Sequence, residues 1–207
     1  MILEQKTYIQ SYCTIHKNEI VLNGKTVFEI ENNGFADFSK KASQYLDMQY
    51  PKFFKMDNLS KLAFLGAELL LKNEEGSSNK ENNTALLFAN NSSSLDTDVK
   101  YQRSIEDEEN YFPSPAVFVY TLPNICLGEI SIRHQLKSEN SFFIFDAFNP
   151  EFMEQYADLL IGTNKADKVL CGWVEYFQEE YKAFLYLVAR EGGTEHDKTT
   201  LETLFNK

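Results

Sequence analysis

The sequence FIFDAFNPEFMEQY, residues 143–156, joins an apolar strand to a helix through a sharp turn. Aromatic and β-branched residues before the turn favour a strand. After the turn, Asn149 suits a helix N-cap, Pro150 the first helical position and Glu151 the positive end of the helix dipole. This segment has the shape of a catalytic turn, although no Cys, Ser, Lys or His occupies it.

Runs of apolar and β-branched residues predict five strands, near residues 6–14, 84–89, 141–146, 167–174 and 181–189. The pair Asn23-Gly24 predicts a tight hairpin within residues 19–30, because it is preferred in primed turns. Helical spacing predicts helices at 55–72, in two pieces across 116–136, at 149–162 and from about residue 198. Asp57 or Asn58 is the expected N-cap of the first of these helices. Polar runs are expected to be irregular at 73–83, 92–98 and 104–115.

The alternation of strands and helices predicts a layered α/β fold with a five-stranded mixed sheet and helices on both faces. We expect this sheet to be mostly parallel, with its last strand antiparallel and at its end. A chain of 207 residues with 43% hydrophobic content can bury one sizeable core. A single domain over residues 1–207 is therefore expected.

Charge and hydropathy exclude several classes of partner. The formal net charge is -11, which repels nucleic acid and anionic membranes but leaves a basic protein surface as a compatible partner. No run near 18 apolar residues is present, and the start MILEQKTYIQ lacks the basic and apolar regions of a secretory signal. The sequence thus predicts a soluble, cytoplasmic protein.

Cysteine and histidine spacing indicates neither a metal nor a cofactor. Cys13, Cys126 and Cys171 stand singly in apolar surroundings, which is typical of buried thiols rather than of disulfides or zinc ligands. The three histidines, His16, His134 and His196, show no HxxxH spacing. His16 and Glu19 form an HxxE pair without a third ligand nearby, and His134 is expected to interact with the carbonyls at a helix end.

Two polar clusters are weighed as sites. Ser92, Ser93 and Ser94 with Asp96 and Asp98 lack a Gly-x-Ser-x-Gly elbow and a neighbouring His, so a loop that caps a helix is favoured over a hydrolase. The acidic run Glu106–Glu109 is interpreted as a solvated loop, with a docking patch as the alternative.

Three blocks of the sequence resemble the N-terminal half of the β-ketoacyl synthases, condensing enzymes of the thiolase superfamily. LPNICLGEISIRHQLKSENSFFIFDA (122–147) resembles the segment that leads into the family's nucleophile strand, with Asn124 at a helix start and Gly128 four residues on. NKADKVLCGW (164–173) resembles its Ala-Asp strand, and KMDNLSKLAFLGAELLL (55–71) resembles an earlier helix. The resemblance covers about residues 55–176.

The departures from the family bear directly on function. In an ungapped register, Ala147 occupies the position of the nucleophilic Cys, and Phe148-Asn149 replace the small residues that follow. Condensation needs a thiolate at a helix N-terminus, which Ala147 cannot supply. The family's two decarboxylating histidines belong to its C-terminal half, which we expect a chain of this length to lack. Cys126 and Cys171 are interpreted as core residues rather than as substitute nucleophiles.

The resemblance implies a non-catalytic ketosynthase-like partner subunit in a fatty acid, polyketide or aryl-polyene type pathway. It also implies that Phe142, Phe143, Ile144 and Phe145 lie at a two-fold interface with a full-length ketosynthase or a second copy. The alternative for this strand is a central position covered by helices on both faces. Two alternative functions are an active acyl-transfer enzyme and a module that binds an acyl group or an acyl carrier protein.

Overall fold

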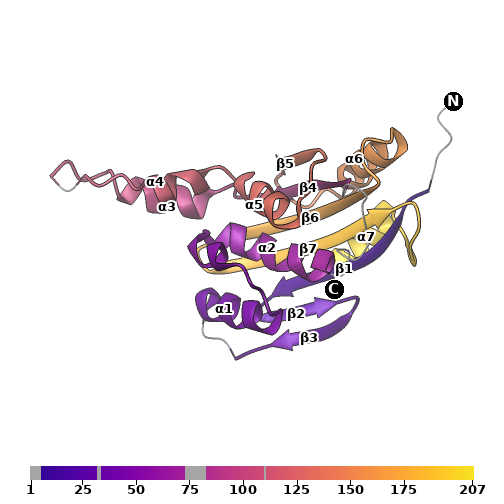
Figure 1. The fold of residues 1–207 in the computed structure, drawn as a ribbon, viewed down its shortest axis with the longest axis horizontal. Coiled ribbons are helices and arrows are strands. Elements are labelled where there is room, and N and C mark those ends of the chain that lie inside the picture. Colours follow the sequence, from indigo (N-terminus) through magenta and orange to yellow (C-terminus); the bar gives the residue numbers. More distant parts are fainter. Residues whose placement is uncertain (1–5, 32–33, 73–82, 110) are drawn as a thin grey trace.

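One eight-stranded sheet organises the computed structural model, which describes residues 6–31, 34–72, 83–109 and 111–207. Along the sheet, the order is β3-β2-β1-β7-β6-β4-β5, and β8 pairs with β1 (Figure 1). The strands are β1 (Tyr8–His16), β2 (Glu19–Leu22), β3 (Lys25–Glu29), β4 (Thr84–Asn90), β5 (Asn140–Ile144), β6 (Lys168–Phe177), β7 (Glu180–Ala189) and β8 (Thr194–Glu195).

Strand directions confirm the mixed α/β sheet and correct its details. Strand β4 runs parallel to β5 and β6, while β7 is antiparallel to both β6 and β1, as predicted for the last core strand. The prediction of a mostly parallel sheet with β7 at its end is wrong. Strand β7 lies inside the sheet, because the hairpin β2–β3 extends it beyond β1 and β8 adds a short antiparallel pairing.

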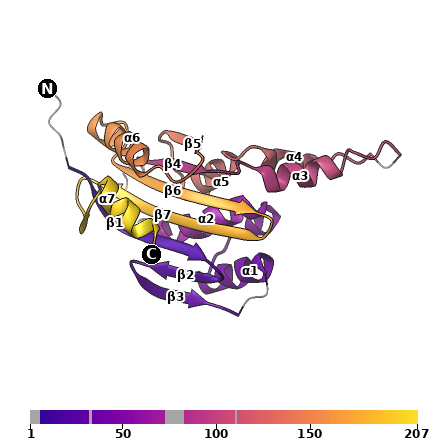
Figure 2. The same cartoon turned by 180° about the vertical axis from the view of Figure 1, so that it is seen from behind.

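Helices cover both faces of the sheet, as predicted. Figure 1 shows α1, α2 and α5 in front of the strands, and Figure 2 shows α6 and α7 on the opposite face. The helices are α1 (Phe35–Tyr45), η1 (Pro51–Lys55), α2 (Asn58–Leu71), α3 (Leu95–Arg103), α4 (Pro115–Phe118), η3 (Val119–Thr121), α5 (Ile125–His134), α6 (Pro150–Gly162) and α7 (Lys198–Phe205).

Each face of the sheet carries its own apolar core. Side chains of α1, α2 and α5 pack on one face, and those of α6 and α7 on the other. Helix α2 lies close to β7 at Gly66, where an added Cβ would come within 2.7 Å of a Leu185 methyl carbon. The fully buried strand β4 lies between β5 and β6, which explains its uninterrupted apolar sequence.

Local capping signals predict several boundaries correctly. Asp57 caps α2, accepting a hydrogen bond from the Ser60 amide at 2.9 Å. Asn23 and Gly24 both have positive φ, 49° and 79°, as the predicted hairpin turn requires. The two helical pieces predicted across 116–136 are both present. The first corresponds to α4 and η3 together, and the second corresponds to α5. The predicted loop at 73–83 lies outside the described residues except for Asn83.

The segment 92–98 is partly helical, contrary to the irregular structure expected there. Helix α3 places Asp96 and Asp98 in its first turn and Lys100 and Arg103 in its last, an arrangement that complements the helix dipole. Helices α3 and α4 form an arm that extends beyond the body of the molecule (Figures 1 and 2). Within the described ranges, no single helix is long and apolar enough to cross a membrane; Pro115–Thr121 and Ile125–His134 meet that criterion only as a pair bent by 98°.

Candidate functional site

The turn between β5 and α6 has the geometry that its sequence predicts. Strand β5 ends at Ile144, and α6 begins at Pro150. Asn149 Oδ1 accepts a hydrogen bond from the Phe152 amide at 3.0 Å, which fixes the helix start. The structure therefore keeps a strand, a sharp turn and a capped helix at the position where the resemblance places a nucleophile.

A cleft of 430 Å³ opens at this turn. Its lining includes the exposed residue Ala147, whose methyl group can neither attack an acyl group nor transfer a proton. The charged groups of the lining are Asp146, Glu151, Glu202 and Lys198, and Lys198 Nζ lies 3.0 Å from a Glu151 carboxylate oxygen. The cleft thus presents a net negative surface around the helix start.

A second cleft, of 560 Å³, lies next to the first at the C-terminal ends of β4 and β6 and shares Asp146 with it. Glu175 Oε2 accepts hydrogen bonds from the amides of Asn91, at 2.7 Å, and Ser92, at 3.2 Å. The other oxygen, Oε1, is buried and makes no hydrogen bond to a described residue. Glu175 therefore holds the loop after β4 and leaves one acceptor for water or a ligand.

This second cleft brings together two residues that lie far apart in the sequence. His16, at the end of β1, and Ser92, after β4, both line it. Sequence spacing had separated the serines from any His. Ser94, also weighed as a site residue, instead donates to the Thr121 carbonyl at 2.6 Å and to Asp98, so its hydroxyl stabilises the arm. Among the described contacts, no hydrogen bond joins a Ser to a His that could act as its base.

The three thiols are buried, as the sequence predicts. Burial raises the pKa of Cys13 to about 12, and it raises the pKa of Cys126 and of Cys171 further above the ordinary thiol value. A buried, protonated thiol is a poor nucleophile. The structure thus favours the interpretation of Cys126 and Cys171 as core residues.

His134 belongs to a network of charged side chains that joins two helices. His134 Nε2 lies 3.2 Å from Oε2 of Glu68, a carboxylate on α2 that also accepts hydrogen bonds from the guanidinium of Arg133 at 2.8 and 3.1 Å. Burial opposes ionisation of Glu68, but the hydrogen bonds from His134 and Arg133 outweigh it and hold the pKa of Glu68 at about 2. The network ties the end of α5 to α2, rather than His134 binding only the helix-end carbonyls.

The third histidine connects the two ends of the chain. His196 Nδ1 lies 3.0 Å from Thr7 Oγ1 and 3.4 Å from Asp158 Oδ1. His16, His134 and His196 lie on different elements, and the described residues contain no group of three or more His, Cys, Asp or Glu that could hold a metal ion.

Strand β5 is the last strand at one edge of the sheet, not a central one. The Phe145 amide donates to the Asn90 carbonyl and the Glu139 carbonyl accepts from the Leu86 amide, so odd-numbered residues bond to β4. In a parallel pair the backbone groups alternate, so the amides and carbonyls of Phe142 and Ile144 point away from the sheet.

The side chains of this strand divide between the two cores. Phe142 packs against one core, and Phe143 and Phe145 pack against the other, where Phe143 and Phe152 form an edge-to-face pair at 4.7 Å. Ile144 remains 49% exposed. The strand is thus partly covered on both faces, while its outer edge pairs with no described strand.

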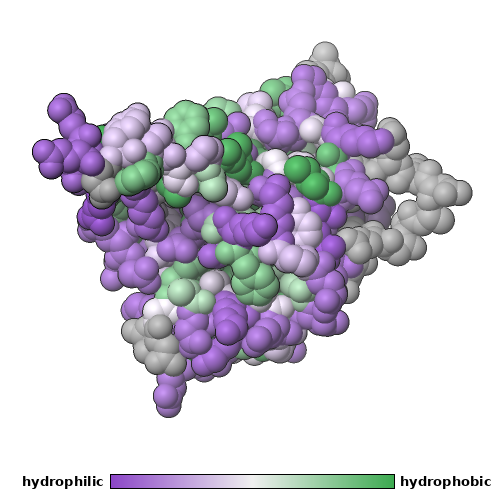
Figure 3. Space-filling model, turned by 60° about the vertical axis from the view of Figure 1, so that its left-hand side comes forward, coloured by the Kyte–Doolittle hydropathy of each residue, from purple (hydrophilic) through white to green (hydrophobic). Residues whose placement is uncertain are grey.

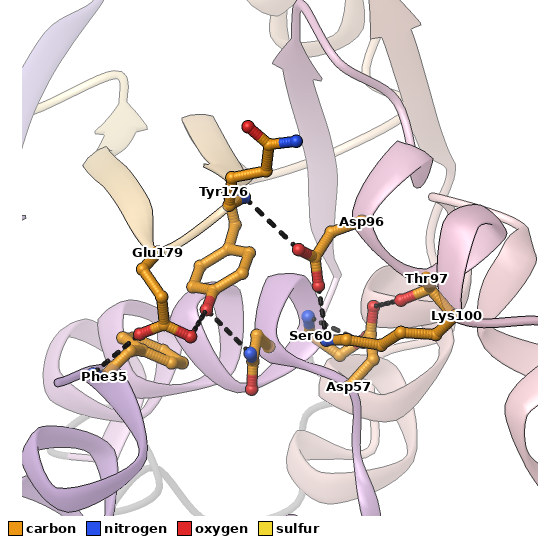
Figure 4. A network of polar contacts seen from close by, with 10 residues as sticks. Phe35, Asp57, Ser60, Asp96, Thr97, Lys100, Tyr176 and Glu179 are labelled. Carbon is orange, nitrogen blue, oxygen red and sulfur yellow. Dashed lines mark hydrogen bonds and ion pairs between the residues drawn. The ribbon is translucent and has the colours of Figure 1, made fainter. Parts of the chain in front are cut away.

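A polar network at the base of the arm was missed by sequence reasoning (Figure 4). Tyr176 Oη donates to Glu179 at 2.7 Å and accepts from the Asn58 side chain at 2.7 Å. Asp96 Oδ1 accepts from the Gln178 amide at 3.2 Å. These contacts join α2, α3 and the β6–β7 turn, which lie far apart in the sequence, so only the fold reveals them.

Comparisons with known proteins identify the fold. No protein-family model and no curated protein sequence matches the chain. Among solved structures it is similar to "The ishigamide ketosynthase/chain length factor", with a TM-score of 0.65 and 17% identity over 89% of this chain and 62% of that one. It is also similar to a chain of the ketosynthase ApeO in complex with its chain length factor ApeC from Xenorhabdus doucetiae, with a TM-score of 0.60 and 13% identity.

Coverage differs between these structures. The second match includes 97% of this chain and 90% of the other, so the two chains are similar in length. A third, the AntDE:AntF complex of a type II polyketide synthase acyl-carrier protein with its ketosynthase, has a TM-score of 0.57 and 15% identity over 97% of this chain and 65% of that one. This chain thus spans less than two thirds of the ishigamide and AntDE:AntF chains. It has the thiolase-like fold of ketosynthases and chain length factors, in the form of a half domain.

Proposed function

We propose that this chain is a cytoplasmic ketosynthase-like partner subunit, without condensing activity of its own, in fatty acid, polyketide or aryl-polyene type biosynthesis. One observation carries the proposal: the turn between β5 and the capped helix α6 lines a cleft, and this lining includes Ala147, at the position where the resemblance places the nucleophile. The methyl group of Ala147 cannot attack an acyl group, which supports a partner role without condensation.

Alternative nucleophiles do not restore that chemistry. An acyl-transfer cysteine needs a thiolate that the substrate can reach, and Cys126 and Cys171 are both buried with raised pKa values. Ser92 lines an open cleft but lacks a hydrogen-bonded base among the described residues. These observations favour a partner role over the active acyl-transfer enzyme.

The open edge of β5 supports pairing with another subunit. Its outward amides and carbonyls at Phe142 and Ile144 can extend a sheet across an interface, and an uncovered apolar edge is otherwise prone to aggregate. The ApeO–ApeC structure is a ketosynthase with its chain length factor, which provides an analogy for such a pairing. We therefore propose a ketosynthase as the partner, with Phe142, Phe143, Ile144 and Phe145 at the interface.

Two measurements test the proposed function. Light scattering of this chain with each purified ketosynthase of its source organism should give a complex of defined mass. Incubation with a labelled acyl thioester should label the ketosynthase but not this chain, and the Cys126→Ala and Cys171→Ala variants should behave identically. A monomer that binds none of those ketosynthases, or a chain that turns over acyl thioester alone, contradicts the proposal.

A further inference from the structure

The arm, residues 91–124 without residue 110, exposes an unusual amount of apolar surface. Of the large hydrophobic side chains that are exposed among the described residues, six lie on the arm: Leu95, Tyr111, Phe112, Phe118, Val119 and Leu122. Phe112 is 73% exposed and Tyr111 is 57% exposed. Exposed apolar side chains that gather in one region mark an interaction surface more often than scattered single ones.

The tip of the arm combines these rings with negative charge. Glu106, Asp107, Glu108 and Glu109 are all exposed and lie two to five residues before Tyr111 in the sequence. The Phe112 amide donates to the Ser104 carbonyl at 3.0 Å, which closes the loop that carries these acids. The Glu109 amide donates to Asp107 Oδ1 at 3.0 Å within it. The tip therefore presents carboxylates and aromatic rings on a hydrogen-bonded turn.

The base of the arm is fixed to the body of the protein. Thr97 Oγ1 donates to Asp57 Oδ2 at 2.9 Å, and the Gln178 amide donates to Asp96 (Figure 4). Burial raises the pKa of Asp57, and the hydrogen bond from Ser60 opposes that rise. An element that is already held in place loses less conformational entropy when it binds a partner. The arm is thus pre-organised to project its tip.

The arm also lies on the same side of the molecule as β5. Both views of the ribbon show α3, α4, α5 and β5 along its upper side (Figures 1 and 2). Ile132 on α5, 65% exposed, and Ile144 on β5, 49% exposed, add apolar surface along that side. Viewed toward the arm, hydrophobic residues gather in the upper part of the surface among hydrophilic ones (Figure 3). The arm and the β5 edge therefore lie along the same side of the molecule (Figures 1 and 2).

We propose that the arm is a second docking element, which seats Tyr111 and Phe112 in an apolar groove rimmed by Lys and Arg on the ketosynthase partner. This inference rests on the proposed function and adds the charge of the partner's surface to it. Carboxylates beside exposed rings match a basic rim around an apolar groove, and they steer association with it. A second copy of this chain, itself at a net charge of -11, would oppose those carboxylates.

The first test separates the arm from other exposed rings. The double variant Tyr111→Ser/Phe112→Ser should bind the ketosynthase at least tenfold more weakly in surface plasmon resonance, mainly through faster dissociation. Phe54→Ser, which removes a 57% exposed ring on η1, is the matched control and should change the affinity less than twofold. Thermal unfolding at the wild-type temperature shows that both variants fold.

The second test addresses charge. Replacing Glu106, Asp107, Glu108 and Glu109 by the corresponding amides should slow association at low ionic strength and flatten its dependence on salt. The matched control replaces four other exposed acids that lie outside both clefts, Glu31, Asp47, Asp167 and Glu191, and changes the net charge equally. A photo-crosslinking residue at position 112 should form its adduct next to Lys or Arg residues of the ketosynthase.

The outcomes distinguish the two proposals. If the wild type binds a ketosynthase and both arm variants bind it equally well, the arm inference is wrong and the proposed function stands. If the wild type binds none of the ketosynthases, both are wrong. A salt-independent association rate, or an adduct at position 112 with a second copy of this chain, would also overturn the arm inference.

Discussion

The two edges of the sheet are built differently. At one edge, β3 exposes Lys25, Thr26 and Glu29, and its pairing with β2 shifts register between Ile20 and Val21. At the other, β5 contains no charged residue and pairs with β4 without a shift. Charges and irregularities at an edge discourage further strands from adding. The first edge is thus protected against strand addition, while the second is open to it.

The difference shows that the lack of charge and of register shifts is confined to the β5 edge and is not shared by the β3 edge. A chain that protects β3 with two charges and an irregular pairing has the means to protect β5 as well. The uncharged β5 therefore fits the partner strand that we propose at this edge.

The largest expected effect concerns the support of the open edge. Glu68 holds Arg133 and His134 at the end of α5, which leads directly into β5. Glu68→Ala leaves these donors without their buried carboxylate and should lower the free energy of unfolding by about 3 kcal/mol. Equilibrium unfolding in urea measures this loss of stability. Lys165→Ala, which removes the exposed partner of Glu139 before β5, is the control and should unfold at nearly the same urea concentration as the wild type.

The same carboxylate predicts a pH dependence. The pKa of Glu68 falls from 4.5 to about 2 on folding, so its stabilising contribution is fully present above about pH 4.5 and decreases as the pH falls toward 2. Over that window the wild type should lose about 3 kcal/mol more stability than Glu68→Gln. Unfolding curves from pH 7 to pH 2 test this. If the free energies of unfolding of the wild type and of Glu68→Gln fall in parallel with pH, ionised Glu68 does not stabilise the fold.

A backbone substitution should break the open edge itself. Ile144 has an outward amide and a 49% exposed side chain, so Ile144→Pro removes a donor for a partner strand without disturbing the pairing with β4. We expect about a hundredfold weaker binding of the ketosynthase, or about 2.8 kcal/mol. Ile144→Val keeps the amide and should bind as the wild type does. Equal binding by both variants would place the interface away from β5.

The smallest effect should come from opening the protected edge. Replacing Lys25 and Glu29 of β3 by Val removes the charges that discourage strand addition. We expect weak, concentration-dependent self-association in sedimentation velocity, while the Lys25→Arg control remains as the wild type. If the Val variant stays unassociated at all concentrations, the register shift alone protects this edge.

Local signals in the sequence predicted much of the fold. The Asn23-Gly24 turn, the Asp57 cap and the Asn149-Pro150 helix start depend on neighbouring residues, and each was found where expected. The alternation of strands and helices predicted the mixed sheet, although with five strands rather than eight. The missed features depend instead on residues distant in the chain.

Long-range contacts explain what the sequence did not reveal. The interior position of β7 results from its pairing with β1, which lies at the other end of the chain. Helix α3 is stabilised by hydrogen bonds of Asp96 with the β6–β7 turn and of Thr97 with the N-cap of α2. The cleft that joins His16 to Ser92 exists only once β1 and β4 share a sheet. None of these pairings leaves a periodic pattern in the sequence.

The charges that line the cleft at Ala147 determine how a thiol introduced there would behave. The positive end of α6, which in a thiol enzyme would stabilise a thiolate, here faces the carboxylates of Asp146, Glu151 and Glu202, with Lys198 as the cation of the lining. Negative charge at this place raises a thiol pKa and repels acyl donors that carry a carboxylate. Ala147→Cys would therefore place a thiol at this turn without lowering its pKa, and the neighbouring carboxylates would have to be replaced as well before that thiol could ionise readily.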